Sequence, residues 1–261
     1  MHGLILSGFI SVIVLMLVAW GIYLFTRVGS LVDLFWALGF VVLMLVYYNL
    51  GEHSSLAAQI MLTLGLLWAL RLFAYLFFYR DSVMVEDPRY TQLSSTWKIR
   101  KSLGFLSNYL LQGALMLLIS SPFMIAFSDL VQFGAFFWVG AVIVVIGLVN
   151  EAIADMQLTH FKRSKHRQGN KVCQNGWWKY SRHPNYFFDW LTWLGFAVMT
   201  LAHPWGWVAL ISPLTLLFVF VGITINITEQ HALVSRGEEY AQYQLTTSKF
   251  FPWFVRTAEQ K

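Results

Sequence analysis

The stretch LILSGFISVIVLMLVAWGIYLFT, residues 4–26, runs for 23 residues without a charged side chain. A helix needs about 20 apolar residues to cross the hydrocarbon core of a membrane. Further predominantly apolar stretches follow at residues 31–50, 56–79, 103–127, 131–154, 186–202 and 204–227. No Lys or Arg precedes residues 4–26 and no A-x-A site follows them, so we expect a retained span and not a cleaved signal peptide. The sequence therefore predicts an all-α integral membrane protein, a bundle of about seven transmembrane helices.

The composition agrees with this class of protein. Hydrophobic residues make up 57% of the 261 residues and charged residues 12%, whereas a soluble domain carries about 25% charged residues. The chain also holds 12 Trp and 11 Tyr, which favour the boundary between lipid and water. Cys173 is the single cysteine, so an intrachain disulfide and a cysteine-based zinc site are excluded and we predict no metal.

The net charge of +5 is explained by membrane topology. Basic residues gather in residues 80–102, in residues 162–182 and in the C-terminal tail, while the turns near Asp129 and His203 carry none. The positive-inside rule then places the N-terminus outside and the C-terminus in the cytoplasm. We expect membrane lipids as partners, and neither nucleic acid nor a protein partner.

Polar residues gather in the C-terminal third of the chain. Glu151 and Asp155 are four residues apart, so they share one face of a predicted helix. Carboxylates are costly against lipid, so the pair either accepts hydrogen bonds from a polar ligand or marks a helix end that emerges into water. The loop 162–182 that follows is either a phosphate-binding rim or a topological signal that also contacts anionic lipid. Its candidate ligand-binding residues are Lys162, Arg163 and Lys171.

A second polar group lies where Pro184 marks the start of a helix, since proline suits the first helical turn. A helix start presents free N–H groups and the positive end of the helix dipole, which favour an anion. A simple helix cap would explain one polar residue here, but several are present. The predicted ligand-binding residues are Tyr180, Arg182, His183, Asn185 and Asp189. Glu229 and His231, at the end of the last span, either extend this site or form an ordinary polar helix end.

These motifs together resemble a known family. The runs Glu151-x3-Asp155-x-Gln157 and Tyr180-Ser-Arg-His-Pro-Asn-Tyr186, followed by Glu229 and Glu239-Tyr240-x2-Tyr243, look like the bacterial steroid 5-alpha-reductase-like family, labelled DUF1295. Asp33-Leu-Phe-Trp36, Trp68-x2-Arg71 and Glu86-Asp-Pro-Arg-Tyr90 are also similar to this family. The resemblance therefore covers most of the chain.

The wider superfamily also holds isoprenylcysteine carboxyl methyltransferases, which resemble this chain in the Arg-His-Pro-x-Tyr core but bind S-adenosylmethionine. Asn185 after the proline resembles the reductase branch. The chain departs from the pattern at Phe188 and Asp189, where the bacterial family often has Gly and Glu. The carboxylate is kept but is one methylene shorter, and Phe188 would narrow a pocket.

The resemblance implies an NADPH-dependent oxidoreductase acting on CH–CH groups. Its substrate would be a hydrophobic, lipid- or steroid-like molecule that enters from the membrane and carries a carbon–carbon double bond conjugated to a carbonyl. One transmembrane domain is implied, with residues 1–128 on the substrate side and residues 129–261 binding the cofactor, in a bacterial inner membrane with the cofactor facing the cytoplasm. The implied cofactor-binding residues are Glu151, Asp155, Lys162, Arg163, Lys171, Tyr180, Arg182, His183, Asn185, Asp189, Glu229, His231 and Tyr243.

Reduction of such a substrate requires a proton or hydrogen-bond donor, because hydride reaching the β-carbon leaves negative charge on the carbonyl oxygen. The catalytic candidates are Tyr90, after the third span, and Asp33, one turn into the second. Asp33 also fits a capping box in Ser30-x-x-Asp33. Glu52 is the third candidate, although the predicted topology places it on the outer side.

Two other functions stay open at this point. The first is a membrane methyltransferase that uses S-adenosylmethionine, and the second is a non-catalytic lipid-binding relative that kept the fold. The basic loop 162–182 favours NADPH over S-adenosylmethionine, which has no phosphate. Phe188 favours the non-catalytic relative.

Overall fold

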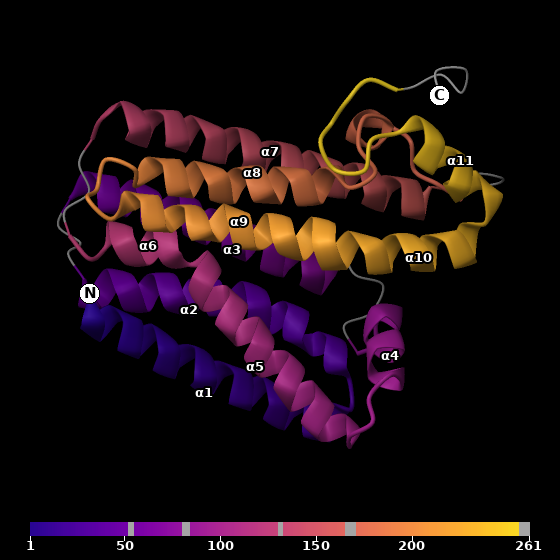
Figure 1. Ribbon diagram of the computed structural model, residues 1–261, viewed down its shortest axis with the longest axis horizontal. Coiled ribbons are helices and arrows are strands. Elements are labelled where there is room, and N and C mark those ends of the chain that lie inside the picture. Colours follow the sequence, from indigo (N-terminus) through magenta and orange to yellow (C-terminus); the bar gives the residue numbers. More distant parts are fainter. Residues whose placement is uncertain (52–54, 80–83, 130–132, 165–170, 256–261) are drawn as a thin grey trace. The chain divides into compact units, whose positions relative to one another are not determined.

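The computed structural model describes residues 1–51, 55–79, 84–129, 133–164 and 171–255. These residues form helices joined by loops (Figure 1), and the extended pairing among them is one isolated bridge between Ser181 and Ser248. Within this part of the chain, six helices are long and apolar enough to cross a membrane. They are α1 (His2–Thr26), the turn η1 (Gly29–Leu31) with α2 (Val32–Leu50), α3 (Leu56–Phe78), α5 (Lys101–Ile119), α7 (Ala135–Arg163) and the composite helix Gly206–Arg236. The predicted all-α integral membrane class is confirmed.

The predicted span 186–202 corresponds to α8, Pro184–Met199, which has 16 residues. At about 1.5 Å per residue, such a helix is shorter than the roughly 30 Å core of a bilayer. α8 is therefore not one of the six long helices found in the described residues. The count of seven spans and their orientation stay predictions.

The predicted span 103–127 is interrupted. α5 ends at Ile119, and α6, Ser121–Ala126, begins with Pro122 in its first turn. Proline lacks the N–H that would continue the preceding helix, so it starts a new one. The last long helix is also composite, because η4 (Gly206–Leu210) and α9 (Ile211–Leu217) lead through a π-helical segment (Phe218–Thr224) to α10 (Ile225–Arg236).

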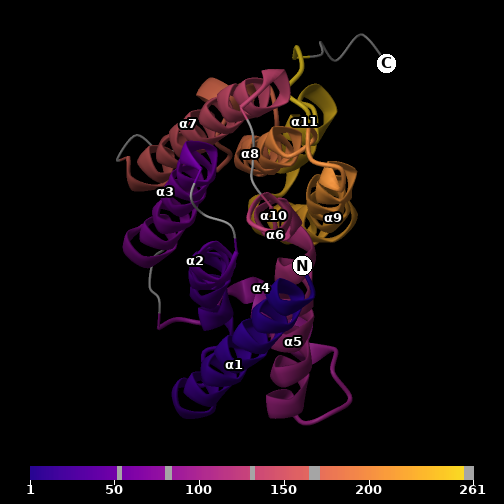
Figure 2. The ribbon, with the colours of Figure 1, turned by 90° about the vertical axis from the view of Figure 1, so that its left-hand side faces the viewer.

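The chain divides into two compact units, and the boundaries lie inside α7, α8 and the composite helix. The first unit comprises Met1–Val142 and Leu194–Thr215. Within it, α2 packs against α1, α3 and α5 (Figure 2). A Cβ atom on Gly39 would lie 1.9 Å from Met116 Cε, so the absence of a side chain allows α2 and α5 to approach closely. The polar start of α2 is thereby held at one end of a tightly packed core.

The second unit comprises Ile143–Trp193 and Leu216–Lys261. It contains the shorter helices η3 (Gly176–Lys179) and α11 (Glu238–Thr246) besides parts of α7, α8 and α10. α7 and α8 touch at Gly147, where a Cβ atom would lie 2.4 Å from Thr192 Oγ1. This contact holds α7 beside the segment that precedes α8. The predicted functional division after residue 128 stays a prediction.

Candidate functional site

Each compact unit contains a group of interacting polar side chains. The Tyr90 cluster of the first unit consists of Asp33, Arg89, Tyr90, Asn108 and Gln112. The Arg182 cluster of the second unit consists of Arg182, His183, Glu229 and Gln244.

The Tyr90 cluster is centred on a short hydrogen bond. The Tyr90 hydroxyl donates to Asp33 Oδ1 at 2.5 Å, and Arg89 Nη2 lies 3.3 Å from Asp33 Oδ2. Gln112 Nε2 donates to the Tyr90 oxygen at 3.4 Å and to Asn108 Oδ1 at 2.8 Å. Tyr90 is 9% exposed and the Asp33 side chain is 17% exposed, so the two predicted catalytic residues form a largely buried pair.

The short helix α4, Pro88–Ser95, presents Tyr90 to this pair. Asp87 is its N-cap and accepts the backbone N–H of Arg89 at 2.9 Å. Pro88 occupies the first turn, where the missing N–H costs nothing. The Asp-Pro-Arg-Tyr sequence thus starts a helix at a defined residue and fixes the direction of the Tyr90 side chain.

Burial raises the pKa of Tyr90 well above its usual value of 10.0, and the negative charge of Asp33 raises it further, while Arg89 opposes this. Tyr90 therefore keeps its proton at neutral pH. The hydroxyl has a single proton, which it donates to Asp33, so its oxygen is left to accept a hydrogen bond.

Glu86 caps the start of the second span. Its carboxylate accepts the N–H groups of Gly29 at 2.6 Å and Ser30 at 2.8 Å. Ser30 Oγ in turn accepts the N–H of Asp87 at 3.3 Å. Glu86, from a distant segment, thus caps the start of the second span, the role that the sequence alternatively offered for Asp33. The same bonds hold residues 86–90 against the start of α2.

The Arg182 cluster is a buried ion pair surrounded by hydrogen bonds. Arg182 Nε donates to Glu229 Oε1 at 2.6 Å and its Nη2 to Oε2 at 3.2 Å. Arg182 Nη1 donates to the carbonyl oxygens of Thr247 at 2.6 Å and Gln244 at 3.0 Å. Gln244 Nε2 also donates to Glu229 Oε2 at 2.8 Å. Arg182 therefore joins the start of α8 to α10 and to the end of α11.

His183 completes the cluster. Its Nε2 lies 3.1 Å from Glu229 Oε1. Its ring stacks on Tyr186 at 5.6 Å, and Tyr186 stacks on Phe220 of the π-helical segment at 4.9 Å. Burial lowers the pKa of His183 below its usual value of 6.5, although the Glu229 carboxylate opposes this. The imidazole is therefore neutral at pH 7, and we infer that Nε2 carries its proton because it faces a carboxylate.

Tyr243 fixes the loop before α8 from the other side. Its hydroxyl donates to the carbonyl oxygens of Trp178 and Ser181, and burial raises the pKa of Tyr243. Trp178 Nε1 donates to the carbonyl oxygen of Ala154 in α7 at 2.9 Å. The Tyr243 hydroxyl thus holds backbone positions on either side of Tyr180.

The polar face of α7 lies against the same loop. Asp155 and Glu151 are each 4% exposed, and Asn185 Nδ2 donates to Asp155 Oδ1 at 3.3 Å. Gln157 Oε1 accepts the N–H of Trp177 at 3.0 Å, next to Gly176 with φ of 59°. The positive φ explains the glycine, since other residues rarely adopt it.

Phe188 is buried, and its ring contacts that of Trp177 at 4.8 Å. It therefore occupies volume that a glycine at the same position would leave open. Asp189, one residue later, is half-buried in α8.

The remaining predicted cofactor-binding residues lie on the surface. Lys162 and Arg163 are exposed at the end of α7, and Tyr180 is 37% exposed. The backbone N–H of exposed Lys171 donates to the Glu239 carboxylate at 2.9 Å. His231 is exposed on α10, whereas Glu229 is buried, because residues two apart on a helix point in different directions. The catalytic candidate Glu52 lies outside the described residues.

Several residues that form hydrogen bonds in or beside the two clusters were not among the residues predicted for the site. Glu86 stood in the motif of Tyr90 and could have been chosen from it. Gln112, Asn108 and Gln244 carried no signal of their own, because a lone amide in a helix is common. The hydrogen bonds that identify them join residues distant in sequence.

Comparison with known proteins identifies a family that matches most of the chain. Residues 19–247 match the family described as "Protein of unknown function (DUF1295)". Steroid 5-alpha-reductase DET2 of Arabidopsis thaliana is 32% identical over 85 residues, which cover 31% of this chain and 30% of that protein. An uncharacterized protein of Schizosaccharomyces pombe is 26% identical over 265 residues, covering 90% of this chain and 76% of that protein. No solved structure shows significant similarity.

Proposed function

The chain belongs to the DUF1295 family, and on this premise we propose that it is an NADPH-dependent reductase of a conjugated carbon–carbon double bond in a hydrophobic, lipid- or steroid-like substrate. The similarity to a steroid 5-alpha-reductase supports a membrane reductase family. The six long apolar helices support an integral membrane enzyme. The proposal includes a nucleotide site on the cytoplasmic side of a bacterial inner membrane.

One observation carries the chemistry, namely the 2.5 Å hydrogen bond between Tyr90 and Asp33. An ionisable side chain within a membrane span is costly and marks a functional site by default. Asp33 lies in the first turn of α2, and its hydrogen-bond partners Tyr90 and Arg89 come from a separate helix. A phenol beside a carboxylate can donate a hydrogen bond and exchange a proton with it.

Tyr90 is the group that we assign to the substrate carbonyl. Its raised pKa keeps the proton on the phenol until negative charge develops on the carbonyl oxygen. The proton is donated to Asp33 in this structure, so it must be released before it meets a carbonyl. The substrate carbonyl would then take the place of Asp33 as the acceptor of the Tyr90 O–H, while Gln112 Nε2 still donates to the Tyr90 oxygen.

The polar residues of the second unit fit a nucleotide cofactor. Buried Asp155 and half-buried Asn185 offer an acceptor and donors for an amide or a ribose hydroxyl. Lys162, Arg163 and Lys171 offer exposed cations for phosphates. When bound, NADPH supplies the hydride. Arg182 donates to Glu229 and to two backbone carbonyls, and Glu229 also accepts from Gln244, so we assign Arg182 and Glu229 to positioning the loop before α8.

Two alternatives differ in their ligand. A methyltransferase would bind S-adenosylmethionine, and a non-catalytic relative would bind lipid alone. The exposed cations favour a ligand with several phosphates, whereas buried Phe188 next to Trp177 favours the non-catalytic relative.

The first experiment measures the affinity of the purified, detergent-solubilised protein for NADPH, NADH and S-adenosylmethionine by titration calorimetry. NADPH should bind most tightly, because cations near 162–171 would pair with its 2′-phosphate. Binding of S-adenosylmethionine but not of NADPH would establish the methyltransferase alternative. If none of the three ligands binds, the non-catalytic lipid-binding relative is the function that is left.

The second experiment tests Tyr90 with progesterone as an enone probe and NADPH deuterated at C4. A product that is heavier by the transferred deuterium demonstrates hydride transfer. Tyr90→Phe should lower kcat and leave NADPH affinity unchanged, because the hydroxyl would act in the transition state. Tyr79→Phe, at an exposed ring at the end of α3, is the matched control. Unchanged kcat in Tyr90→Phe would remove Tyr90 from the catalytic site.

A further inference from the structure

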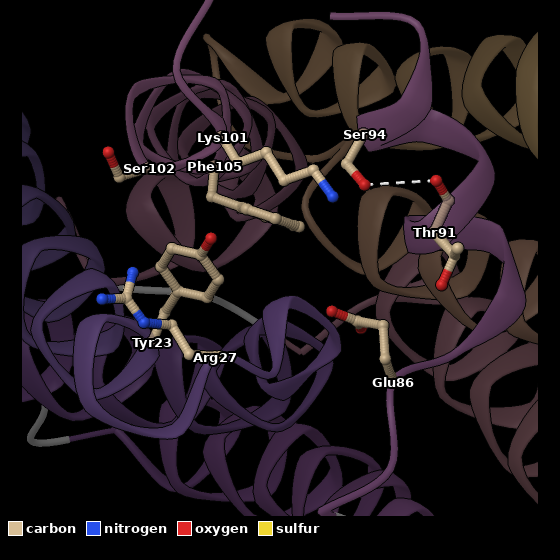
Figure 3. A pocket seen from close by; sticks show the side chains of 8 residues that line it. All are labelled: Tyr23, Arg27, Glu86, Thr91, Ser94, Lys101, Ser102 and Phe105. Carbon is tan, nitrogen blue, oxygen red and sulfur yellow. Dashed lines mark hydrogen bonds between the residues drawn. The ribbon is translucent and has the colours of Figure 1, made fainter.

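A cavity of about 460 Å³ lies at one end of the first unit, between the C-terminal end of α1, the short helix α4 and the start of α5. Figure 3 shows the Lys101 ammonium and the Glu86 carboxylate on opposite sides of its central space. Its polar lining includes Tyr23, Arg27, Glu86, Thr91 and Lys101. Neither Tyr90 nor Asp33 lines this cavity, so it is separate from the catalytic pair.

Arg27 occupies a position where glycine is usual. It follows the last residue of α1 in the left-handed conformation, with φ of 60°, and its N–H bonds to the Tyr23 carbonyl at 2.8 Å. Among the described residues it is the only one other than glycine with positive φ. Glycine is the common residue at such a helix end because it adopts this conformation without strain. The side chain of Arg27 lines the cavity.

Lys101 is also placed against the local electrostatics. It is the first residue of α5, whose first turn contains no acidic residue. A cation at a helix N-terminus faces the positive end of the helix dipole, and this is unfavourable unless an anion is close. The unbonded N–H groups of that turn have the same preference. Both cations line the cavity, and Figure 3 shows the Tyr23 ring between the Arg27 guanidinium and the Lys101 ammonium.

Glu86 offsets only part of this charge. Its two oxygens accept the N–H groups of Gly29 and Ser30 at 2.6 and 2.8 Å, so hydrogen bonds hold its carboxylate at the start of the second span. The two cations outnumber the single carboxylate. The hydroxyl groups of Tyr23 and Thr91 add polar partners of the kind that a multi-oxygen anion accepts.

Apolar surface adjoins the cavity on the same two spans. Phe25 of α1 is 90% exposed and Leu103 of α5 is 49% exposed. Both residues lie at the cavity ends of their spans, Phe25 in the last turn of α1 and Leu103 in the first turn of α5. A ligand that combines a phosphate with long apolar chains would match this arrangement, since its chains would cover α1 and α5. Basic residues next to a span on the predicted cytoplasmic side are also the usual recognition pattern for anionic lipid.

We propose that this cavity binds a phosphate group, supplied by an anionic membrane phospholipid, and that Arg27 and Lys101 are its cationic contacts. The site is independent of the proposed reductase activity. A soluble phosphate or the phosphates of NADPH have the same chemistry, so the experiment must separate these sources.

Native mass spectrometry of the detergent-solubilised protein with phosphatidylglycerol measures this binding. Arg27→Gln/Lys101→Gln should weaken it about tenfold or more, because losing hydrogen bonds to a charged group costs roughly one power of ten in affinity. The matched control is Lys98→Gln/Arg100→Gln. It removes one Lys and one Arg from exposed positions beside α5 that do not line the cavity, and it should leave binding unchanged.

Competition identifies the source of the phosphate. Phosphatidylglycerol should stay bound in millimolar inorganic phosphate or NADPH, and NADPH affinity should be the same in both double variants. Displacement by either soluble anion would overturn the lipid assignment, as would an equal loss of lipid in the two double variants. Lys101→Gln alone replaces the double variant if that variant does not fold, and Lys101→Arg should restore lipid binding.

Discussion

The buried pair of Arg182 and Glu229 allows a quantitative test by the substitution Glu229→Gln. This change keeps the size of the side chain and removes its charge. Glu229 accepts from Arg182 Nε at 2.6 Å, Arg182 Nη2 at 3.2 Å and Gln244 Nε2 at 2.8 Å, and it lies 3.1 Å from His183 Nε2. Glutamine has one acceptor oxygen, so its NH₂ group would face N–H donors that now bond to the second carboxylate oxygen.

The expected loss follows from this geometry. The side chains of Arg182 and Glu229 are 9% and 10% exposed, and removing one partner of a buried ion pair costs about 3–5 kcal/mol. Arg182 would still donate to the carbonyls of Thr247 and Gln244. We therefore expect the lower end of the range, about 3 kcal/mol in the free energy of unfolding.

The measurement is unfolding of the protein in mixed micelles of increasing denaturing detergent, followed by tryptophan fluorescence. Glu238→Gln is the control, because Glu238 is exposed in the first turn of α11, where a carboxylate contributes at most about 1 kcal/mol. The loss in Glu229→Gln should also persist at high salt, since buried pairs are screened little. A loss no larger than that of Glu238→Gln would refute the assignment of Arg182 and Glu229 as the brace of the loop before α8.

Three further predictions concern the pH dependence of stability, the cofactor and the topology. Because the pKa of His183 is lowered in the folded protein, the unfolded chain binds the proton more readily, and stability is fully present above pH 6.5 and falls as the pH drops below it. The slope should be at most about 1.4 kcal/mol per pH unit. It should disappear in His183→Gln and persist in His231→Gln; a slope retained in His183→Gln would contradict the assignment. Asn185→Ala should weaken NADPH binding by about 0.5–1.5 kcal/mol in calorimetry without lowering stability; full affinity with lower stability would make Asn185 only a cap. Reporter fusions at residues 90 and 250 should report the cytoplasm and a fusion at residue 129 the outside, and the reverse pattern would invert the predicted topology.

The Tyr90–Asp33 pair illustrates how far the sequence carried the candidate site. Each residue was a catalytic candidate from its position and motif, but their separation of 57 positions in the sequence hid their contact. The same is true of Arg182 and Glu229, which are 47 residues apart. Separating exposed His231 from buried Glu229 required only the helical period, because residues two apart point in different directions.

Hydropathy and residue spacing were sufficient for the membrane class and for six long helices, since apolar length is a local property and the bilayer selects it directly. Local sequence also accounts for the start of α4 at Pro88 and for the turn at Gly176. Tertiary structure alone decided which carboxylate caps the second span, which cation is paired in the interior and which cations line the cavity near Lys101. These outcomes depend on contacts between separate helices, and such contacts are set by packing in three dimensions that no single stretch of sequence specifies.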